Sequence, residues 1–171
     1  DCNADDINRA VQAAQGCYYQ GPWGRMQPSE RGRVITRIGD VITKNAERLG
    51  EVETRDNGKL PKNITPSLKS WQTDSFYYYA GMCDKFEGSL LPTEVPDMLN
   101  YLRWEPFGVC ALITAWNSPL GALICKLAPA LAAGNAVVIK PSEHASVSTL
   151  ELMSVLQEAD LPEGLLNVVT G

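Results

Sequence analysis

The second half of the sequence alternates apolar runs of strand length with helical segments, and this alternation constrains the fold more than any other feature. Apolar runs occupy Val109–Thr114, Ala136–Ile139 and Leu165–Val169. One helical segment opens at Pro119, and Ser146 is expected to cap another. Strands joined by helical crossovers pair in parallel, so this pattern predicts a β-α-β-α-β unit. We expect its first strand to be buried on both faces.

The first half of the chain has the periodicity of helices. Asn3 or Asp5 is expected to cap a first helix. A long second helix is predicted to start at Ser29, continue through Val52 and end at Gly58, a residue suited to a left-handed cap. A third is predicted within 67–86, where bulky aromatic side chains favour packing against a sheet over a ligand pocket. The fold class is therefore α/β, with N-terminal helices preceding a parallel sheet.

A proline-rich stretch with short alternating segments separates these halves, and we expect it to form a protruding hairpin. Its aromatic residues, such as Tyr101 and Trp104, suit either a partner surface or packing of an edge strand within the chain. We therefore divide the chain into a helical part (1–87), the hairpin (88–106) and the sheet unit (107–171).

Composition excludes several classes of protein. The 171 residues are 44% hydrophobic and 20% charged, as in a folded domain, and the net charge of -5 is unfavourable for nucleic acid or an anionic membrane. No apolar run reaches the length of a membrane span. Five cysteines without a C-x-x-C pair and one histidine, His144, argue against a disulfide framework and a metal site. We expect a cytoplasmic chain with reduced thiols.

Polar residues follow the predicted strands where a parallel sheet binds ligands, beyond the carboxyl ends of the strands. After the second strand, Lys140 and Glu143 could hold a vicinal diol such as a ribose. After the first, Asn117 offers a neutral amide that could stabilise an oxyanion. The alternatives are a surface ion pair for Lys140 and Glu143, a turn-forming role for Asn117, and a lysine at 126 that only extends from an apolar face into solvent.

Several long motifs resemble the aldehyde dehydrogenase superfamily. They are the run from Glu105 through Ala-Trp-Asn-Ser-Pro, the run from Lys126 through Gly-Asn-Ala-Val-Val-Ile-Lys-Pro-Ser-Glu, and Leu-Pro-Glu-Gly-Leu-Leu-Asn-Val-Val-Thr-Gly at 161–171. Upstream, Gly21-Pro22-Trp23 and Asp56-Asn57-Gly58-Lys59 are similar as well. The likeness covers nearly the whole chain and implies a Rossmann-like cofactor fold.

The resemblance implies roles for individual residues. Asn117 matches an asparagine that stabilises the thiohemiacetal oxyanion, and Lys126 matches a lysine that some members place near the active site. Lys140 and Glu143 match residues that hold the adenine ribose, with Ser142 beside them. The residues implied to line the nicotinamide end of the dinucleotide site are Ile113, Thr114, Ala115 and Trp116. A carboxylate at 143 favours NAD over NADP, although NADP remains compatible.

The resemblance also implies an aldehyde substrate, a carboxylic acid product and assembly as a homodimer or homotetramer through the hairpin. The chain departs from the family at Ala115, where proline is common, and at Ser118, where phenylalanine is common. None of its cysteines has the sequence context of the family's nucleophile, and Cys110 and Cys125 are expected to be core residues.

Neither the general-base glutamate nor the catalytic domain is recognisable in these residues. We therefore expect an incomplete domain, the N-terminal part of a longer enzyme, that is inactive alone. Two alternatives stay open: a non-catalytic nucleotide-binding or assembly module, and an unrelated doubly wound binding domain.

Overall fold

A three-stranded parallel sheet forms the centre of the molecule. The computed structural model describes residues 1–171. The strands are β3 (Val109–Ile113), β4 (Ala136–Lys140) and β5 (Leu166–Val168), in the order β3-β4-β5. Ile113 lies opposite Lys140 and Ile139 lies opposite Val168, so the three carboxyl ends meet at one edge. The predicted α/β class and the β-α-β-α-β unit are confirmed.

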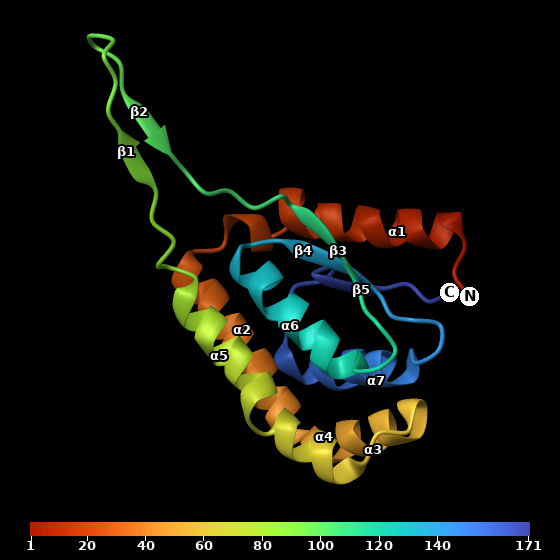
Figure 1. Cartoon of the computed structure of the whole chain (residues 1–171). Coiled ribbons are helices and arrows are strands. Elements are labelled where there is room, and N and C mark those ends of the chain that lie inside the picture. Colours follow the sequence, from red (N-terminus) through yellow and green to blue (C-terminus); the bar gives the residue numbers. More distant parts are fainter.

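Helices cover both faces of this sheet (Figure 1). Helix α1 (Ala4–Gln15) lies on one face, and Asn3 caps it by accepting from the backbone N–H groups of Asp5 and Asp6. Helix α6 (Pro119–Ala132) packs on β3 and β4, and helices α2 and α5 pack against α6. The two chain termini lie side by side, since the Cys2 N–H donates to the Thr170 carbonyl (2.7 Å). No helix combines the length and apolarity needed to cross a membrane.

The long second helix predicted from the sequence is two helices. Helix α2 (Pro28–Lys44) begins one residue before the predicted start, and α3 (Ala46–Asn57) follows it. Asn45 separates them with non-helical dihedrals (φ -100°, ψ 14°), and its side-chain amide donates to the Val41 carbonyl (3.0 Å). The Asn45 backbone N–H donates to the same carbonyl (3.0 Å), so the side-chain bond is made in addition to the helical one, at the point where the two helices meet. Gly58 ends α3 with a φ of 79°, as predicted.

The predicted third helix is also divided. Helix α4 (Pro61–Leu68) starts at a proline, where a missing N–H costs nothing, and α5 (Trp71–Met82) ends before Phe86. Ser70 breaks the run with non-helical dihedrals, and its hydroxyl donates to the Pro66 carbonyl. Helix α5 packs on α2 and α6 and buries Phe76, while Trp71 and Tyr77 are exposed, so the prediction that the aromatic face packs against the sheet was wrong.

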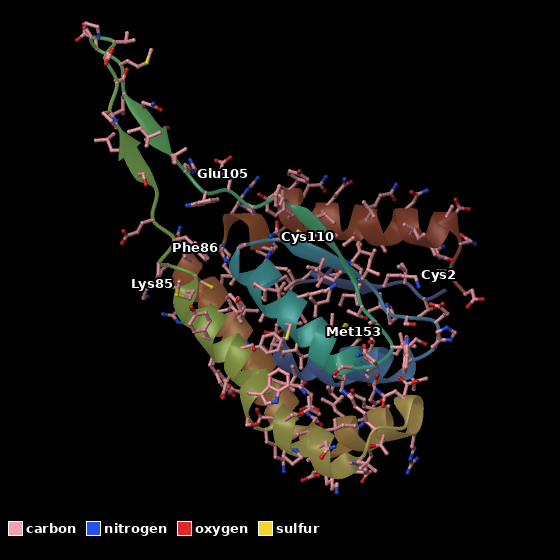
Figure 2. The ribbon with its side chains drawn as sticks, in the orientation of Figure 1. Cys2, Lys85, Phe86, Glu105, Cys110 and Met153 are labelled. Carbon is pink, nitrogen blue, oxygen red and sulfur yellow. The ribbon has the colours of Figure 1, made fainter.

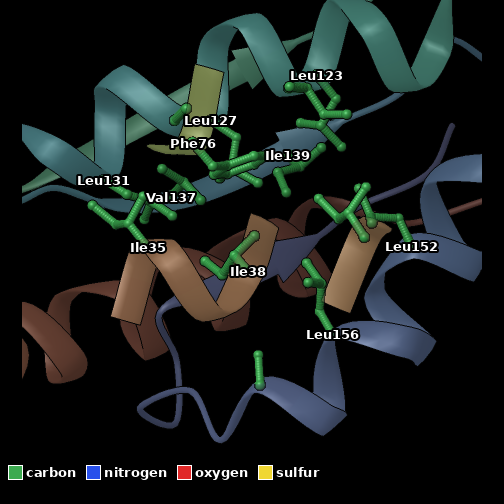
Figure 3. Close-up of a cluster of buried hydrophobic side chains, with 14 of the residues drawn as sticks. Ile35, Ile38, Phe76, Leu123, Leu127, Leu131, Val137, Ile139, Leu152 and Leu156 are labelled. Carbon is green, nitrogen blue, oxygen red and sulfur yellow. The ribbon is translucent and has the colours of Figure 1, made fainter. Parts of the chain in front are cut away.

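The core lies between the sheet and these helices (Figure 3). Leu123, Leu127 and Leu131 are four residues apart on one side of α6, where they meet Val137 and Ile139 of β4. The other contributors include Ile35 and Ile38 of α2 and Phe76 of α5, together with Leu152 of α7 (Val147–Val155) and Leu156 of the 3-10 helix η3 (Leu156–Ala159). All are almost fully buried. Burial of each large side chain stabilises the fold by about 1.5 to 3 kcal/mol.

Strand β3 is only partly buried, so the expectation that both its faces would be covered was wrong. The strand order puts β3 at the edge of the sheet, and Ala111 and Ile113 are exposed. The central strand β4 has the burial that a covered parallel strand should have.

The predicted hairpin is present and extends away from the body of the molecule (Figure 1). Strands β1 (Ser89–Leu91) and β2 (Asn100–Leu102) pair antiparallel, and their side chains project into solvent on both sides of the ribbon (Figure 2). Tyr101 and Trp104 are 61% and 74% exposed. Packing within the chain therefore does not account for these aromatic residues.

Candidate functional site

The loops after β3 and β4 leave the sheet side by side. The Thr114 N–H donates to the Lys140 carbonyl (3.1 Å), and the Val169 N–H donates to the Ile139 carbonyl (2.9 Å). Backbone bonds thus hold the starts of these loops and the last residues of the chain at one edge. This edge is where parallel α/β sheets bind ligands.

The loop after β4 carries an accessible ion pair. Lys140 Nζ lies 3.6 Å from Glu143 Oε2 and donates to the Pro141 carbonyl (3.1 Å). The pKa of the Glu143 carboxyl is lowered first by the backbone N–H of Glu143 itself and then by the neighbouring His144 and Lys140. The carboxyl is therefore ionised at neutral pH. Ser142 Oγ lies 3.4 Å from the same carboxylate. An ammonium donor beside an open carboxylate acceptor fits a vicinal diol.

His144 faces solvent. Its side chain is exposed, and its Nε2 lies 3.6 Å from Glu143 Oε1. The imidazole is one of the neighbours that lower the pKa of the Glu143 carboxyl.

The loop after β3 presents its residues in two environments. Thr114 is buried, and its hydroxyl has no hydrogen-bond partner. Ala115, Trp116 and Asn117 are exposed, and the Asn117 side chain makes no hydrogen bond within the protein. The amide of Asn117 is therefore free to donate to a ligand.

Lys126 lies against the start of that loop. It projects from α6, is exposed, and donates from Nζ to the Ile113 carbonyl (2.5 Å). The structure thus joins Lys126 to the exposed residue Ile113 at the carboxyl end of β3. A lysine that only extends from an apolar face into solvent would not make this bond.

The cysteines differ from expectation at one position. Cys110 is half-buried and packs against the core, but Cys125 is exposed on α6, so its prediction as a core residue was wrong. Cys17 and Cys83 are the buried thiols, and burial raises the pKa of both, as it also does for Cys110.

Sequence reasoning assigned no structural role to three residues at or just beyond the end of α3, which contact α7, Ser118 and one another. Asp56 accepts hydrogen bonds from the N–H and hydroxyl of Ser148 in α7, and Lys59 donates to Ser118. Glu53 is 1% exposed and lies 3.8 Å from Lys59. A signal was present, because Glu53 interrupts the apolar spacing that Leu49 continues along α3.

Ser146 occupies the N-cap position of α7, as predicted, but its side chain makes no capping hydrogen bond. Asp56 supplies that acceptor from another helix. The Asp56 carboxylate therefore caps the N-terminus of α7 in place of the Ser146 side chain.

Sequence relatives cover the whole chain. The family model described as aldehyde dehydrogenase family matches residues 1–171. The (Z)-2-((N-methylformamido)methylene)-5-hydroxybutyrolactone dehydrogenase of Acinetobacter baylyi is 42% identical over 100% of this chain and 35% of its own length. The mitochondrial aldehyde dehydrogenase of Rattus norvegicus is 40% identical over 99% of this chain and 33% of its own length. The chain thus spans about a third of the length of these curated relatives.

Solved structures agree with the sequence comparison. An NAD-dependent aldehyde dehydrogenase from Sinorhizobium meliloti superposes with a TM-score of 0.92 at 34% identity, over 100% of this chain and 34% of that one. Betaine aldehyde dehydrogenase from Staphylococcus aureus, solved in complex with NAD+, gives 0.90 at 34% identity, over 98% of this chain and 33% of that one. By sequence and by fold, the chain belongs to the aldehyde dehydrogenase family.

Proposed function

We propose that this chain is the cofactor-binding part of an enzyme that oxidises an aldehyde to a carboxylic acid with NAD(P). The observation that carries the proposal is the edge at which Lys140 ends β4 and Glu143 follows it, directly beside the loop of Asn117. The NAD+ complex of the similar Staphylococcus aureus protein supports the choice of ligand.

The donor set fits a dinucleotide. Glu143 would accept from the ribose hydroxyls and Lys140 would donate to them, with the Ser142 hydroxyl beside both. The ionised carboxylate would repel a 2'-phosphate, which favours NAD over NADP. Ile113, Thr114, Ala115 and Trp116 would line the nicotinamide end. When bound, the cofactor accepts the hydride that the aldehyde loses on oxidation.

Asn117 would act on the substrate. Its free side-chain amide would donate to the oxyanion that forms when a thiolate adds to an aldehyde. Lys126 is an additional candidate near that position through its bond to Ile113. Neither residue can act as the nucleophile. We therefore propose that the 171 residues alone bind the cofactor without turning over an aldehyde.

The same proposal includes the division of the chain into 1–87, 88–106 and 107–171, the cytoplasmic location, and assembly as a homodimer or homotetramer. The exposed hairpin supports the assembly.

Calorimetric titration of the chain with NAD tests the proposal. We expect saturable binding that Lys140→Ala weakens roughly 10- to 150-fold, since a hydrogen bond to a charged group contributes about 1.5 to 3 kcal/mol. Lys62→Ala is the matched control, because Lys62 is exposed on α4 and has no ion pair. Equal affinity of Lys140→Ala and the parent chain would refute the assignment of this edge.

A second assay separates the enzyme hypothesis from a non-catalytic nucleotide-binding module. The chain is incubated with NAD and a panel of aldehydes, and NADH is followed by absorbance. We expect no sustained production from these residues alone, and sustained production would contradict that part of the proposal.

A further inference from the structure

We propose that Lys59 is a positioning residue, which fixes the loop of Asn117 by donating a hydrogen bond to Ser118. Lys59 Nζ lies 2.8 Å from Ser118 Oγ, although 59 residues separate the two in the chain. The functional consequence rests on the proposed role of Asn117, but the contact itself does not.

The backbone around Lys59 is held in one conformation. Gly58 adopts a φ of 79°, which favours glycine, and reverses the chain at the end of α3. The Lys59 N–H donates to Asn57 Oδ1 (2.9 Å). This turn directs the lysine toward Ser118 at the start of α6.

A buried carboxylate holds the ammonium group. Glu53 Oε1 lies 3.8 Å from Lys59 Nζ, and its side chain is 2% exposed against 39% for the lysine. The Asn57 amide approaches the same oxygen at 3.5 Å, while Oε2 has no partner. Because an unpaired carboxylate is costly to bury, Glu53 favours the lysine position that also reaches Ser118.

The Ser118 hydroxyl is free to accept this bond. Ser118 occupies the N-cap position of α6, yet its side chain does not cap the helix. A Cβ atom on Gly121 would lie 2.8 Å from Ser118 Oγ, so this glycine provides the space that the hydroxyl occupies. Serine at 118 and glycine at 121 together allow the contact with Lys59.

The bond fixes the part of the loop nearest to Asn117. The start of the loop is held by the Thr114 N–H on Lys140 and by Lys126 on the Ile113 carbonyl. The Asn117 side chain makes no hydrogen bond within the protein, so its position depends on its backbone neighbours. Lys59 holds the next residue and thereby limits the movement of the amide.

Residue-resolved amide hydrogen exchange of the whole chain, without cofactor, tests this role. We expect Ser118→Ala to accelerate exchange of the backbone amides at positions 117 and 118 roughly three- to tenfold, as loss of a charge-assisted hydrogen bond predicts. Lys59→Met should do the same, and the double variant should add nothing to either change. Lys59→Arg should restore protection, because the guanidinium also donates.

Lys62→Met is the matched control, and exchange of the β4 amides reports whether each variant remains folded. If Ser118→Ala leaves loop exchange at the parent value while β4 stays protected, the proposal is overturned. Additive effects of Lys59→Met and Ser118→Ala would overturn it as well. Failure of NAD binding would refute the proposed function and leave this result standing, since no nucleotide is present in the exchange experiment.

Discussion

Asp56 of α3 caps helix α7 by accepting two hydrogen bonds from Ser148, which lies 92 residues further along the chain. Asp56 Oδ2 lies 2.8 Å from the Ser148 backbone nitrogen and 2.9 Å from its hydroxyl. Helix α7 begins just after the loop of Lys140 and Glu143. Asp56 thus contacts the helix that follows one loop of the candidate site, and Lys59, just beyond α3, contacts the other loop at Ser118.

Asp56→Ala should lower the free energy of unfolding by about 1 to 2 kcal/mol, the usual cost of losing a helix N-cap. The loss leaves the first turn of α7 without a side-chain cap, because Ser146 does not supply one. Denaturant unfolding measures the change. Glu51→Ala, at an exposed position of the same helix with no ion pair, is the control. Equal stability of the two variants would contradict the capping role.

Glu53 predicts a pH dependence of stability. Burial raises the pKa of its carboxyl above the ordinary 4.5, although the neighbouring Lys59 opposes this rise. The folded state therefore binds the proton more tightly than the unfolded state, so this group favours folding most below about pH 4.5. That contribution is lost as pH rises through the raised pKa.

Glu53→Gln cannot titrate and isolates this effect. The unfolding free energy of the parent chain minus that of Glu53→Gln should fall as pH rises from 4.5 towards neutrality. Urea unfolding at a series of pH values gives this difference. The contributions of the other carboxylates cancel in it, because both proteins contain them. A difference that grows with pH would mean that Lys59 outweighs burial at this site.

Asn135 joins three parts of the fold and should be costly to replace. Its Oδ1 accepts from the buried Gly108 N–H (3.0 Å), its Nδ2 donates to the Ala130 carbonyl (3.1 Å), and its carbonyl accepts from Trp23 Nε1 (3.1 Å). Asn135→Ala should destabilise by about 2 to 3 kcal/mol, because it leaves a buried donor without a partner. Thermal unfolding should show no comparable loss for Asn63→Ala, at an exposed position of α4.

Glu143 should control the choice between NAD and NADP. Glu143→Gln removes the negative charge that would repel a 2'-phosphate, so the ratio of the NADP Kd to the NAD Kd should fall roughly tenfold. Both constants come from calorimetric titration. Glu163→Gln, which removes an exposed carboxylate before β5, should leave the ratio unchanged. An unchanged ratio in Glu143→Gln would place the ribose elsewhere.

The parallel sheet was predictable because its evidence is local. A continuous apolar run such as Ala136–Ile139, bounded by helical segments, indicates a covered parallel strand without further information. The breaks at Asn45 and Ser70 were missed because helical periodicity does not encode side-chain bonds to the preceding turn. The exposure of Ile113 depends on strand order, which apolar spacing does not encode.

In the candidate site, too, local features were predictable and long-range contacts were not. Lys140, Glu143 and Asn117 could be predicted as candidates because each lies at or just after the carboxyl end of a strand, and the rule for parallel sheets puts those positions at one edge. Their contacts with α3 were missed, since Lys59 is 59 residues from Ser118 and Asp56 is 92 residues from Ser148. The sequence showed only a glutamate on an apolar helix face and the motif Asp56-Asn57-Gly58-Lys59, neither of which indicates these contacts.

The most direct test of the central claim is a titration of the isotope-labelled chain with NAD, monitored by backbone amide shifts. We predict saturable shifts confined to residues 113–118, 140–146 and 170–171, with one dissociation constant for all three segments. Saturable shifts that centre instead on residues of the hairpin (88–106) would contradict a single dinucleotide site at this edge. Different dissociation constants for the three segments would contradict it as well.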